Sequence, residues 1–325
     1  MRLFANAHFD FLRSRKKAYV LSGTMLSLGL IGIVLNFATL GSWANYGVDF
    51  TGGTLIQVRM AEGVTDADLR EALGGVNSPP ITRFGAENEF VIRTPLAEGV
   101  DVAAADQGVR TELAASPTIG AFEVVRTEFV GPKIGAEMNQ RAAMAILISF
   151  LLILVYLAFR FELRFGWAAL IATAHDLFIT LGFIALFRLE VSLTTVAAVL
   201  TIIGYSMNDT IIIFDRIREN LNKKGGRRED PLVLINRAIN ETLPRTILTV
   251  ATVLATLLAL LALGGPVVRD FTIVLILGVV IGTYSSIFVA SPALVEIQRR
   301  WGTKEEAERK REAGRRPRGK QVIPV

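Results

Sequence analysis

Six long apolar stretches constrain the fold of this chain more than any other feature of its sequence. A helix that crosses the hydrocarbon core of a bilayer needs about 20 apolar residues. With 51% hydrophobic residues and a mean hydropathy of +0.45, the chain is predicted to be a multi-pass α-helical membrane protein with six transmembrane helices. The stretches lie at residues 18–40, 142–159, 167–187, 191–214, 246–263 and 271–294.

Basic residues beside the apolar stretches predict how the chain is threaded through the membrane. The first stretch follows a basic segment and is longer than the 7–15 residues of a signal-peptide core, so we expect an uncleaved first span. Lysine and arginine flanks mark the cytoplasmic side, which places residues 1–17, the loop 215–245 and the basic tail 297–325 in the cytoplasm. Residues 41–140 then lie outside, and residues 141–296 form a five-helix transmembrane region.

The outer region is polar enough to be a folded extracytoplasmic domain. Alternating apolar residues predict four strands, and two capped or alanine-rich segments predict helices. Their order is β-α-β-β-α-β, which is that of an α+β ferredoxin-like domain. The predicted elements are 54–60, 65–73, 81–84, 89–93, 102–115 and 121–130.

A carboxylate interrupts the fourth apolar stretch near its cytoplasmic end. Asp209 follows Asn208 and lies four residues after Tyr205, a spacing expected to gather a hydroxyl, an amide and a carboxylate on one helical face. An acid at the centre of a spanning helix costs about 2.5–3.5 kcal/mol on insertion scales, and such residues tend to face a pathway or a partner. We therefore favour a proton or ion role for Asp209. The alternative is a hydrated acid that ends the span.

Arg245 opens the fifth apolar stretch directly after a Leu-Pro pair. It is the natural cation for Asp209 if the fourth and fifth helices are neighbours, as a hairpin implies. The residues alone favour a simpler interpretation, in which Arg245 is a positive anchor that extends to the interface.

His175 and Asp176 lie near the middle of the third apolar stretch. A buried histidine can change charge near neutral pH, and an acid in low dielectric binds a proton more readily than in water, so either residue could hold a proton. A hydrogen-bonded pair that only locks two helices together is an equally good interpretation.

Small residues recur every four positions in the sixth apolar stretch, at Gly278, Gly282, Ser286 and Ala290. Such a stripe lets a second helix approach closely, so it predicts helix packing and carries no catalytic implication.

The segment 47–54 reads Gly-Val-Asp-Phe-Thr-Gly-Gly-Thr and resembles a phosphate-binding loop only faintly, since it has no lysine. We expect Asp49, Gly52 and Gly53 to shape the junction between the first span and the first strand.

Several classes of function have no support in the residues. The chain has no cysteine and two distant histidines, which argues against a metal site, and no nucleophile–base pair is recognisable. We therefore expect no enzyme activity and no cofactor. The basic residues lie beside apolar stretches, so the formal charge of +5 does not indicate nucleic acid.

Four motifs together resemble the SecF family. They are Gly-Val-Asp-Phe-Thr-Gly-Gly-Thr at 47–54, His-Asp at 175–176, Gly-Tyr-Ser-Met-Asn-Asp-Thr at 204–210 and Glu-Thr-Leu-Pro-Arg-Thr at 241–246. SecF is the smaller half of the SecDF protein-export complex, a relative of the resistance–nodulation–division transporters. The resemblance covers the chain from its first span to its sixth.

The resemblance implies a function that composition alone does not supply. It implies SecD as a partner, association with the SecYEG channel and its accessory subunits, and use of the proton gradient to pull the preprotein in late steps that no longer depend on the SecA ATPase. It places Asp209 and Arg245 in the proton path. It also implies the cytoplasmic (inner) membrane of a bacterium or archaeon as the location, with both termini in the cytoplasm.

Two other functions remain compatible with the sequence. One is a passive scaffold, in which the charged residues only hold helices together. The other is half of a related proton-driven exporter of lipids or small molecules, although such exporters tend to have much larger outer domains than the 41–140 region.

Overall fold

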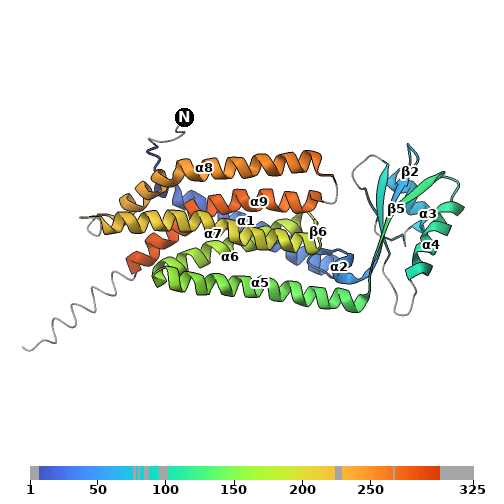
Figure 1. Ribbon diagram of the computed structural model, residues 1–325, viewed down its shortest axis with the longest axis horizontal. Helices are drawn as coiled ribbons and strands as arrows, with labels where there is room; N and C mark the ends of the chain where they lie inside the picture. Colours follow the sequence, from blue (N-terminus) through green and yellow to red (C-terminus); the bar gives the residue numbers. More distant parts are fainter. Residues whose placement is uncertain are drawn as a thin grey trace, which may run out of the picture.

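The computed structural model describes residues 7–300 apart from 76–77, 80, 84–87, 95–101, 224–228 and 266–267. It is an elongated molecule, with a bundle of long helices and a small α/β domain at one end (Figure 1). The described part of the chain holds six helices long and apolar enough to cross a membrane, which confirms the predicted number. They are α1 (Arg15–Leu40), α5 (Pro132–Arg160), α6 (Leu163–Leu186), α7 (Leu193–Asn222), α8 (Pro231–Leu263) and α9 (Arg269–Ser285), which continues through the π-helical segment η5 (Ser286–Ala290).

The helices extend beyond the apolar stretches that predicted them. We expected a loop over 215–245, but α7 continues to Asn222 and α8 already begins at Pro231. Asp230 caps α8 by accepting a hydrogen bond from the N–H of Leu232 at 3.0 Å. Hydropathy marks only the apolar part of a helix, whereas backbone hydrogen bonding continues into polar sequence. The predicted basic tail lies mostly outside the described residues.

The six helices differ in how deeply they are buried. In α6, α7 and α9 half or more of the apolar window is buried inside the chain, compared with 6% in α5 and 11% in α8. The bundle is therefore built around α6, α7 and α9, with α1, α5 and α8 at its periphery. The apolar sides of α5 and α8 are left on the surface of this chain.

Glycines allow close helix contacts at two places in the bundle. A Cβ atom on Gly29 of α1 would lie 2.8 Å from the Cα of Gly182 on α6, so any side chain at either position would push these helices apart. A Cβ on Gly278 of α9 would lie 2.2 Å from the Cγ1 of Ile202 on α7. Small residues thus bring α9 against α7 and α1 against α6.

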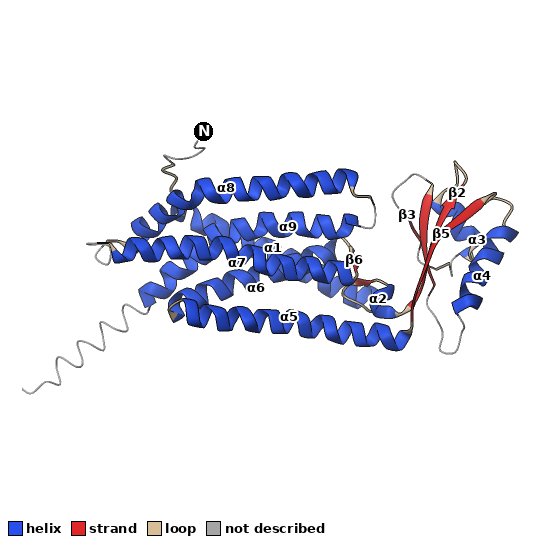
Figure 2. Ribbon diagram, viewed as in Figure 1, coloured by secondary structure: helices blue, strands red, loops and turns tan. Residues whose placement is uncertain are grey.

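The α/β domain, which we call the outer domain after its predicted location, has the predicted order of elements. Its sheet is antiparallel with the strand order β3-β4-β2-β5, the order of the split-βαβ arrangement. Figure 2 shows the domain at the end of the bundle, joined to it through β2 and β5. Its elements are β2 (Gly53–Met60), α3 (Asp66–Ala72), β3 (Ile81–Arg83), β4 (Glu89–Thr94), α4 (Val102–Ala115) and β5 (Phe122–Val130).

The outer domain has an apolar core of its own. Ile56, Phe90, Ile92 and Leu113 are fully buried there, because alternate residues of β2 and β4 face the two helices. Thr65 caps α3 in a reciprocal capping box with Asp68.

One pairing was not expected from the sequence. The two-residue strand β1 (Asn45–Tyr46), just after α1, pairs in parallel with β6 (Glu190–Val191) in the turn between α6 and α7. The short helix α2 (Val48–Thr51) follows β1. These elements form a platform between the bundle and the outer domain.

Candidate functional site

Asp209 lies inside the bundle on α7, where its side chain is buried and 1% of the residue is exposed. In the part of the chain that the structure describes, neither carboxylate oxygen has a hydrogen-bond partner. The hydroxyl of Thr283 on α9 interacts weakly with the carboxylate, and the guanidinium of Arg245 on α8 acts on it through its charge. An acid that is buried without partners is costly, and buried polar groups are otherwise almost always hydrogen-bonded.

Asn208 does not share this environment. It is exposed on the surface of the chain, whereas Asp209 is buried and Tyr205 is half-buried. The expected single face of hydroxyl, amide and carboxylate is therefore wrong for the amide. Consecutive helical residues point about 100° apart at 3.6 residues per turn, and the edge of the bundle falls between Asn208 and Asp209.

Arg245 is exposed on α8, directly after Pro244, which lies inside the helix. The acid and the cation lie on helices that pack against each other, since α7 and α8 are in contact. Among the described residues, however, they do not form a hydrogen-bonded pair. Within the part of the chain that the structure describes, the hydroxyl of Thr246, the next residue, is buried without a hydrogen-bond partner, as is that of Tyr205.

The second acid of the bundle has a different environment. Asp176 on α6 is 1% exposed, and both of its carboxylate oxygens have hydrogen-bond partners. Oδ1 lies 2.9 Å from the Nδ1 of His175. Oδ2 accepts hydrogen bonds from the hydroxyls of Ser206 on α7 and, at 2.7 Å, Ser285 on α9. The pair thus joins three helices.

The sequence did not single out Ser206 or Ser285 for this role. Ser206 lies within the 204–210 motif, three residues before Asp209, and Ser285 precedes the stripe residue Ser286. The only feature of the sequence that could have indicated this role is that both are small polar residues within apolar stretches. Nothing local, however, distinguishes a serine that meets a distant carboxylate from one that hydrogen-bonds its own helix.

The stripe on α9 packs against α7 beside Asp209. A Cβ on Gly282 would lie 2.9 Å from the Cβ of Ser206, and the hydroxyl of Ser286 is 2.8 Å from that of Thr210. The residues on either side of the buried acid are therefore held by close packing and hydrogen bonds. In the described residues there is no cluster of three or more potential metal ligands.

The segment 47–54 forms the outer junction of the bundle. Asp49 accepts a hydrogen bond from the N–H of Leu193 at 2.9 Å, at the start of α7. Gly52 and Gly53 have φ angles of 70° and 132°, which favour glycine. A Cβ on Gly47 would lie 2.5 Å from the Oε1 of Glu190, so this glycine allows the Glu190 carboxylate to approach the backbone.

Glu190 connects this junction to the outer domain, because its carboxylate forms an ion pair with Arg93 at the end of β4. Burial raises the pKa of the Glu190 carboxyl, an effect that Arg93 opposes and the carboxylates of Asp270 and Asp49 reinforce. The N–H of Glu190 also donates to Asp270 at the start of α9, at 3.3 Å. Glu190 thus contacts both α9 and the outer domain.

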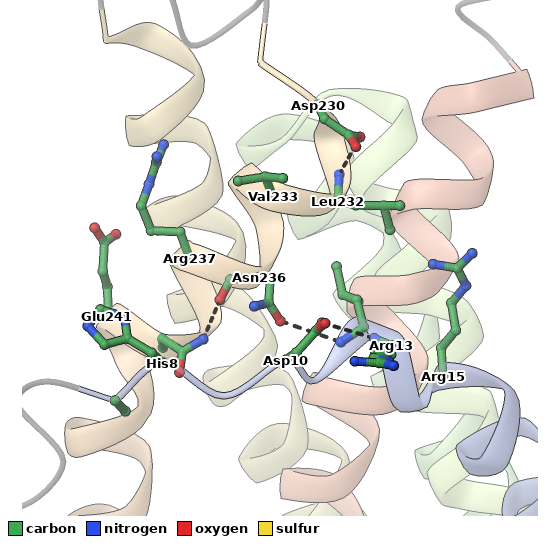
Figure 3. Close-up of a pocket in the computed structure, with 13 residues that line it drawn as sticks. His8, Asp10, Arg13, Arg15, Asp230, Leu232, Val233, Asn236, Arg237 and Glu241 are labelled. Carbon is green, nitrogen blue, oxygen red and sulfur yellow. Dashed lines mark hydrogen bonds between the residues drawn. The ribbon is translucent and has the colours of Figure 1, made fainter.

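At the end of the bundle away from the α/β domain, residues 7–11 form a strap that crosses α8 beside a cavity of about 750 Å³ (Figure 3). The side chain of Asn240 accepts a hydrogen bond from the N–H of Phe9 and donates one to its carbonyl, both at 2.8 Å. Asn236 accepts from the N–H of Phe11 at 2.9 Å. Two side-chain amides thus hold the strap on the helix that carries Arg245.

Two family models match the chain. Residues 111–300 match the C-terminal model of the protein export membrane proteins SecD/SecF, and residues 37–64 match the SecD/SecF GG motif. The second match contains the outer junction.

Protein translocase subunits SecF are among the curated relatives. The one from Gemmatimonas aurantiaca is 45% identical over 308 residues, which are 93% of this chain and 90% of that protein. The one from Rickettsia rickettsii is 40% identical over 313 residues, which are 95% of this chain and 98% of that protein.

Two solved structures of SecDF share the fold. The crystal structure of SecDF, a translocon-associated membrane protein from Thermus, is 37% identical with a TM-score of 0.77, and the match covers 91% of this chain and 39% of that one. SecDF in a super-membrane-facing form is 38% identical with a TM-score of 0.66, over 93% of this chain and 40% of that one. The chain spans about two fifths of the length of these SecDF chains.

Proposed function

Because the chain belongs to the SecD/SecF family of protein export membrane proteins, we propose that it acts as the smaller half of a SecDF complex in which proton movement past Asp209 promotes preprotein export. SecD is the proposed partner, with a matching set of six spans. The SecYEG channel, with its accessory subunits, and the emerging preprotein are the further proposed partners.

The contrast between the two buried acids carries this proposal. Both oxygens of Asp176 make well-formed hydrogen bonds, whereas among the described residues the Asp209 oxygens accept none of that geometry and interact with the Thr283 hydroxyl and the Arg245 charge instead. A carboxylate without partners is more stable when it binds a proton or meets a water or cation, so Asp209 is the acid poised to change state. Asp176, by contrast, holds α6 to α7 and α9 through its hydrogen bonds.

Arg245 supplies the second half of the switch. Its guanidinium stays charged at any physiological pH, whereas Asp209 is either charged or neutral. Protonation of Asp209 would remove the attraction that Arg245 exerts on it, and the packing of α7 against α8 would then change. Moving one charge through 100 mV is worth about 2.3 kcal/mol, enough to bias a two-state bundle.

The outer junction gives such a change a route to the outer domain. Glu190 begins the turn into α7, hydrogen-bonds Asp270 at the start of α9 and pairs with Arg93 of the outer domain. A shift of α7 relative to α9 would therefore act directly on β4. We place the outer domain outside the cytoplasmic membrane, with both termini inside, and we assign the movement to late export steps that follow SecA action.

Replacing Asp209 with asparagine tests the proposal, because asparagine keeps the shape and polarity but cannot titrate. We expect Asp209→Asn to assemble with SecD and to lose the part of export that depends on the proton gradient. Asp215→Asn is the matched control: it lies on the same helix and pairs with Arg160 outside the apolar part of α7. We expect that control to retain proton-dependent export.

The competing hypothesis of a passive scaffold predicts a different result. If Asp209→Asn supports export as well as the parent at equal protein level, with and without the gradient, Asp209 is structural and the proton-coupled function is wrong. Loss of SecD assembly in Asp209→Asn would likewise assign Asp209 to packing.

A further inference from the structure

A chain of hydrogen bonds runs from the backbone of α1 through α9 to the acid of α6. The hydroxyl of Tyr284 on α9 lies 2.8 Å from the carbonyl oxygen of Ala18 and 3.0 Å from the hydroxyl of Ser22, both on α1. Ser22 lies 3.0 Å from the Nε2 of His175, whose Nδ1 is 2.9 Å from Asp176. Ser22, His175 and Asp176 are buried.

The carbonyl oxygen of Ala18, at the start of this series of hydrogen bonds, sets the direction of every bond in it. A carbonyl oxygen only accepts, so Tyr284 must donate its one proton to Ala18. Tyr284 can then only accept from Ser22, which uses the single proton of that hydroxyl. The bond between Ser22 and His175 must therefore be donated by the histidine, and its Nε2 carries a proton.

This direction determines how many protons the His175–Asp176 pair holds. With Nε2 protonated, the bond to Asp176 needs one more proton, either on Nδ1 or on the carboxyl oxygen. The first case is an imidazolium beside a carboxylate, and the second is a neutral imidazole beside a carboxylic acid. Both hold two protons and carry no net charge.

Burial favours the same state. The pair sits among Ser206 of α7, Ser285 and Tyr284 of α9 and Ser22 of α1, and in the described residues no charged group other than His175 itself acts on Asp176. A pair with one proton would bury a net negative charge with no cation to compensate it, which costs far more than burying a neutral pair.

We propose that His175 and Asp176 form a second proton-binding site of the bundle, separate from Asp209, whose proton holds α1 against α6 and α9. When the site gives its proton up to water, Nδ1–H donates to the carboxylate and Nε2 becomes an acceptor. Ser22 then turns its proton toward Nε2, and its contact with Tyr284 has no proton left. Release of the proton thus removes one hydrogen bond between α1 and α9.

The protonation of Nε2 can be measured directly, because the chain contains only two histidines. The full chain with His8→Gln, in lipid nanodiscs and with ¹⁵N-labelled histidine rings, gives the spectrum of His175 alone. At pH 7 we expect Nε2 to be protonated. Nδ1 is then either protonated too, or bare and accompanied by an infrared carboxylic-acid band that Asp176→Asn removes. A bare Nε2, or a bare Nδ1 without that band, overturns the proposal.

Removing the Tyr284 hydroxyl tests whether the hydrogen bonds through Ser22 keep Nε2 protonated. Tyr284→Phe frees the Ser22 proton, so giving up the proton no longer removes a hydrogen bond. The ratio of bare to protonated Nε2 should rise about tenfold at a given pH, which corresponds to one hydrogen bond. Tyr156→Phe, at an exposed tyrosine of α5, is the matched control and should leave the ratio unchanged.

An unchanged ratio in folded Tyr284→Phe would show that the hydroxyl chain does not set the proton count. If that variant does not fold, the spectrum of the parent still decides the proposal. The measurement needs no transport, so its outcome is independent of the Asp209→Asn experiment.

Discussion

Replacing Gly278 with alanine drives a methyl group into the side chain of Ile202 on the neighbouring helix. An ideal Cβ at Gly278 would lie 2.2 Å from Cγ1 and 2.3 Å from Cδ1 of Ile202. Ile202 is 2% exposed and belongs to the buried apolar core of the bundle. Two contacts this short place the substitution at the upper end of the cost of overpacking a core, about 3 kcal/mol.

The gain in helix propensity offsets part of that cost. Alanine is favoured over glycine by about 1 kcal/mol in a helix interior, so Gly278→Ala should destabilise the chain by about 2 kcal/mol. Gly204 on α7 supplies the matched control, because it is exposed and a Cβ there would meet nothing within 4 Å. Gly204→Ala should be neutral or stabilising by up to about 1 kcal/mol.

Denaturant unfolding of the full chain in mixed micelles measures both variants. Ile202→Ala removes the obstructing atoms. We therefore expect the double variant Gly278→Ala/Ile202→Ala to lose less stability than the sum of the two single losses, by about 1–3 kcal/mol. If Gly278→Ala proves as stable as Gly204→Ala, or if the two substitutions simply add, the small residues on α9 are not what lets α7 approach.

Three further predictions concern other parts of the molecule. An impermeant thiol reagent should label Glu112→Cys in intact cells and Asn222→Cys only after permeabilisation, and the opposite pattern would invalidate the threading. Asn240→Ala should speed hydrogen exchange in the strap, since both backbone bonds of that side chain are lost, and unchanged exchange would show that Asn236 suffices. Thr65→Ala should cost the outer domain about 1 kcal/mol at pH 7. Hydrogen bonds from Thr65 lower the pKa of Asp68, so the part of this cost that depends on the Asp68 carboxylate exists above the ordinary pKa of an aspartate and is lost as the pH falls through the lowered pKa. The cap from the Asp68 N–H to the Thr65 hydroxyl persists in acid, so a cost that does not fall at all in strong acid would contradict the prediction.

The elements of the fold follow from local sequence. Six apolar stretches predicted six helices, because a bilayer demands about 20 apolar residues per span wherever the chain is placed. Alternating residues and the Thr65 cap predicted the β-α-β-β-α-β order for the same kind of reason: side-chain periodicity and capping act over a few neighbours. The ends of α7 and α8 were misjudged, since hydropathy records lipid contact and not backbone hydrogen bonding.

The difference between the environments of the two buried acids was decided by tertiary structure alone. Asp176 and Asp209 look alike as acids within apolar stretches. Only the packing shows that Ser206 and Ser285 hydrogen-bond Asp176, whereas among the described residues Asp209 accepts no hydrogen bond of comparable geometry. The face on which Asn208 points depends in the same way on where α7 meets its neighbours. Hydrogen-bond partners 30 and 109 residues away in the chain leave no trace in local periodicity. The sequence therefore determined which acids lie within the apolar stretches, and the assembled bundle determined which side chains surround each of them.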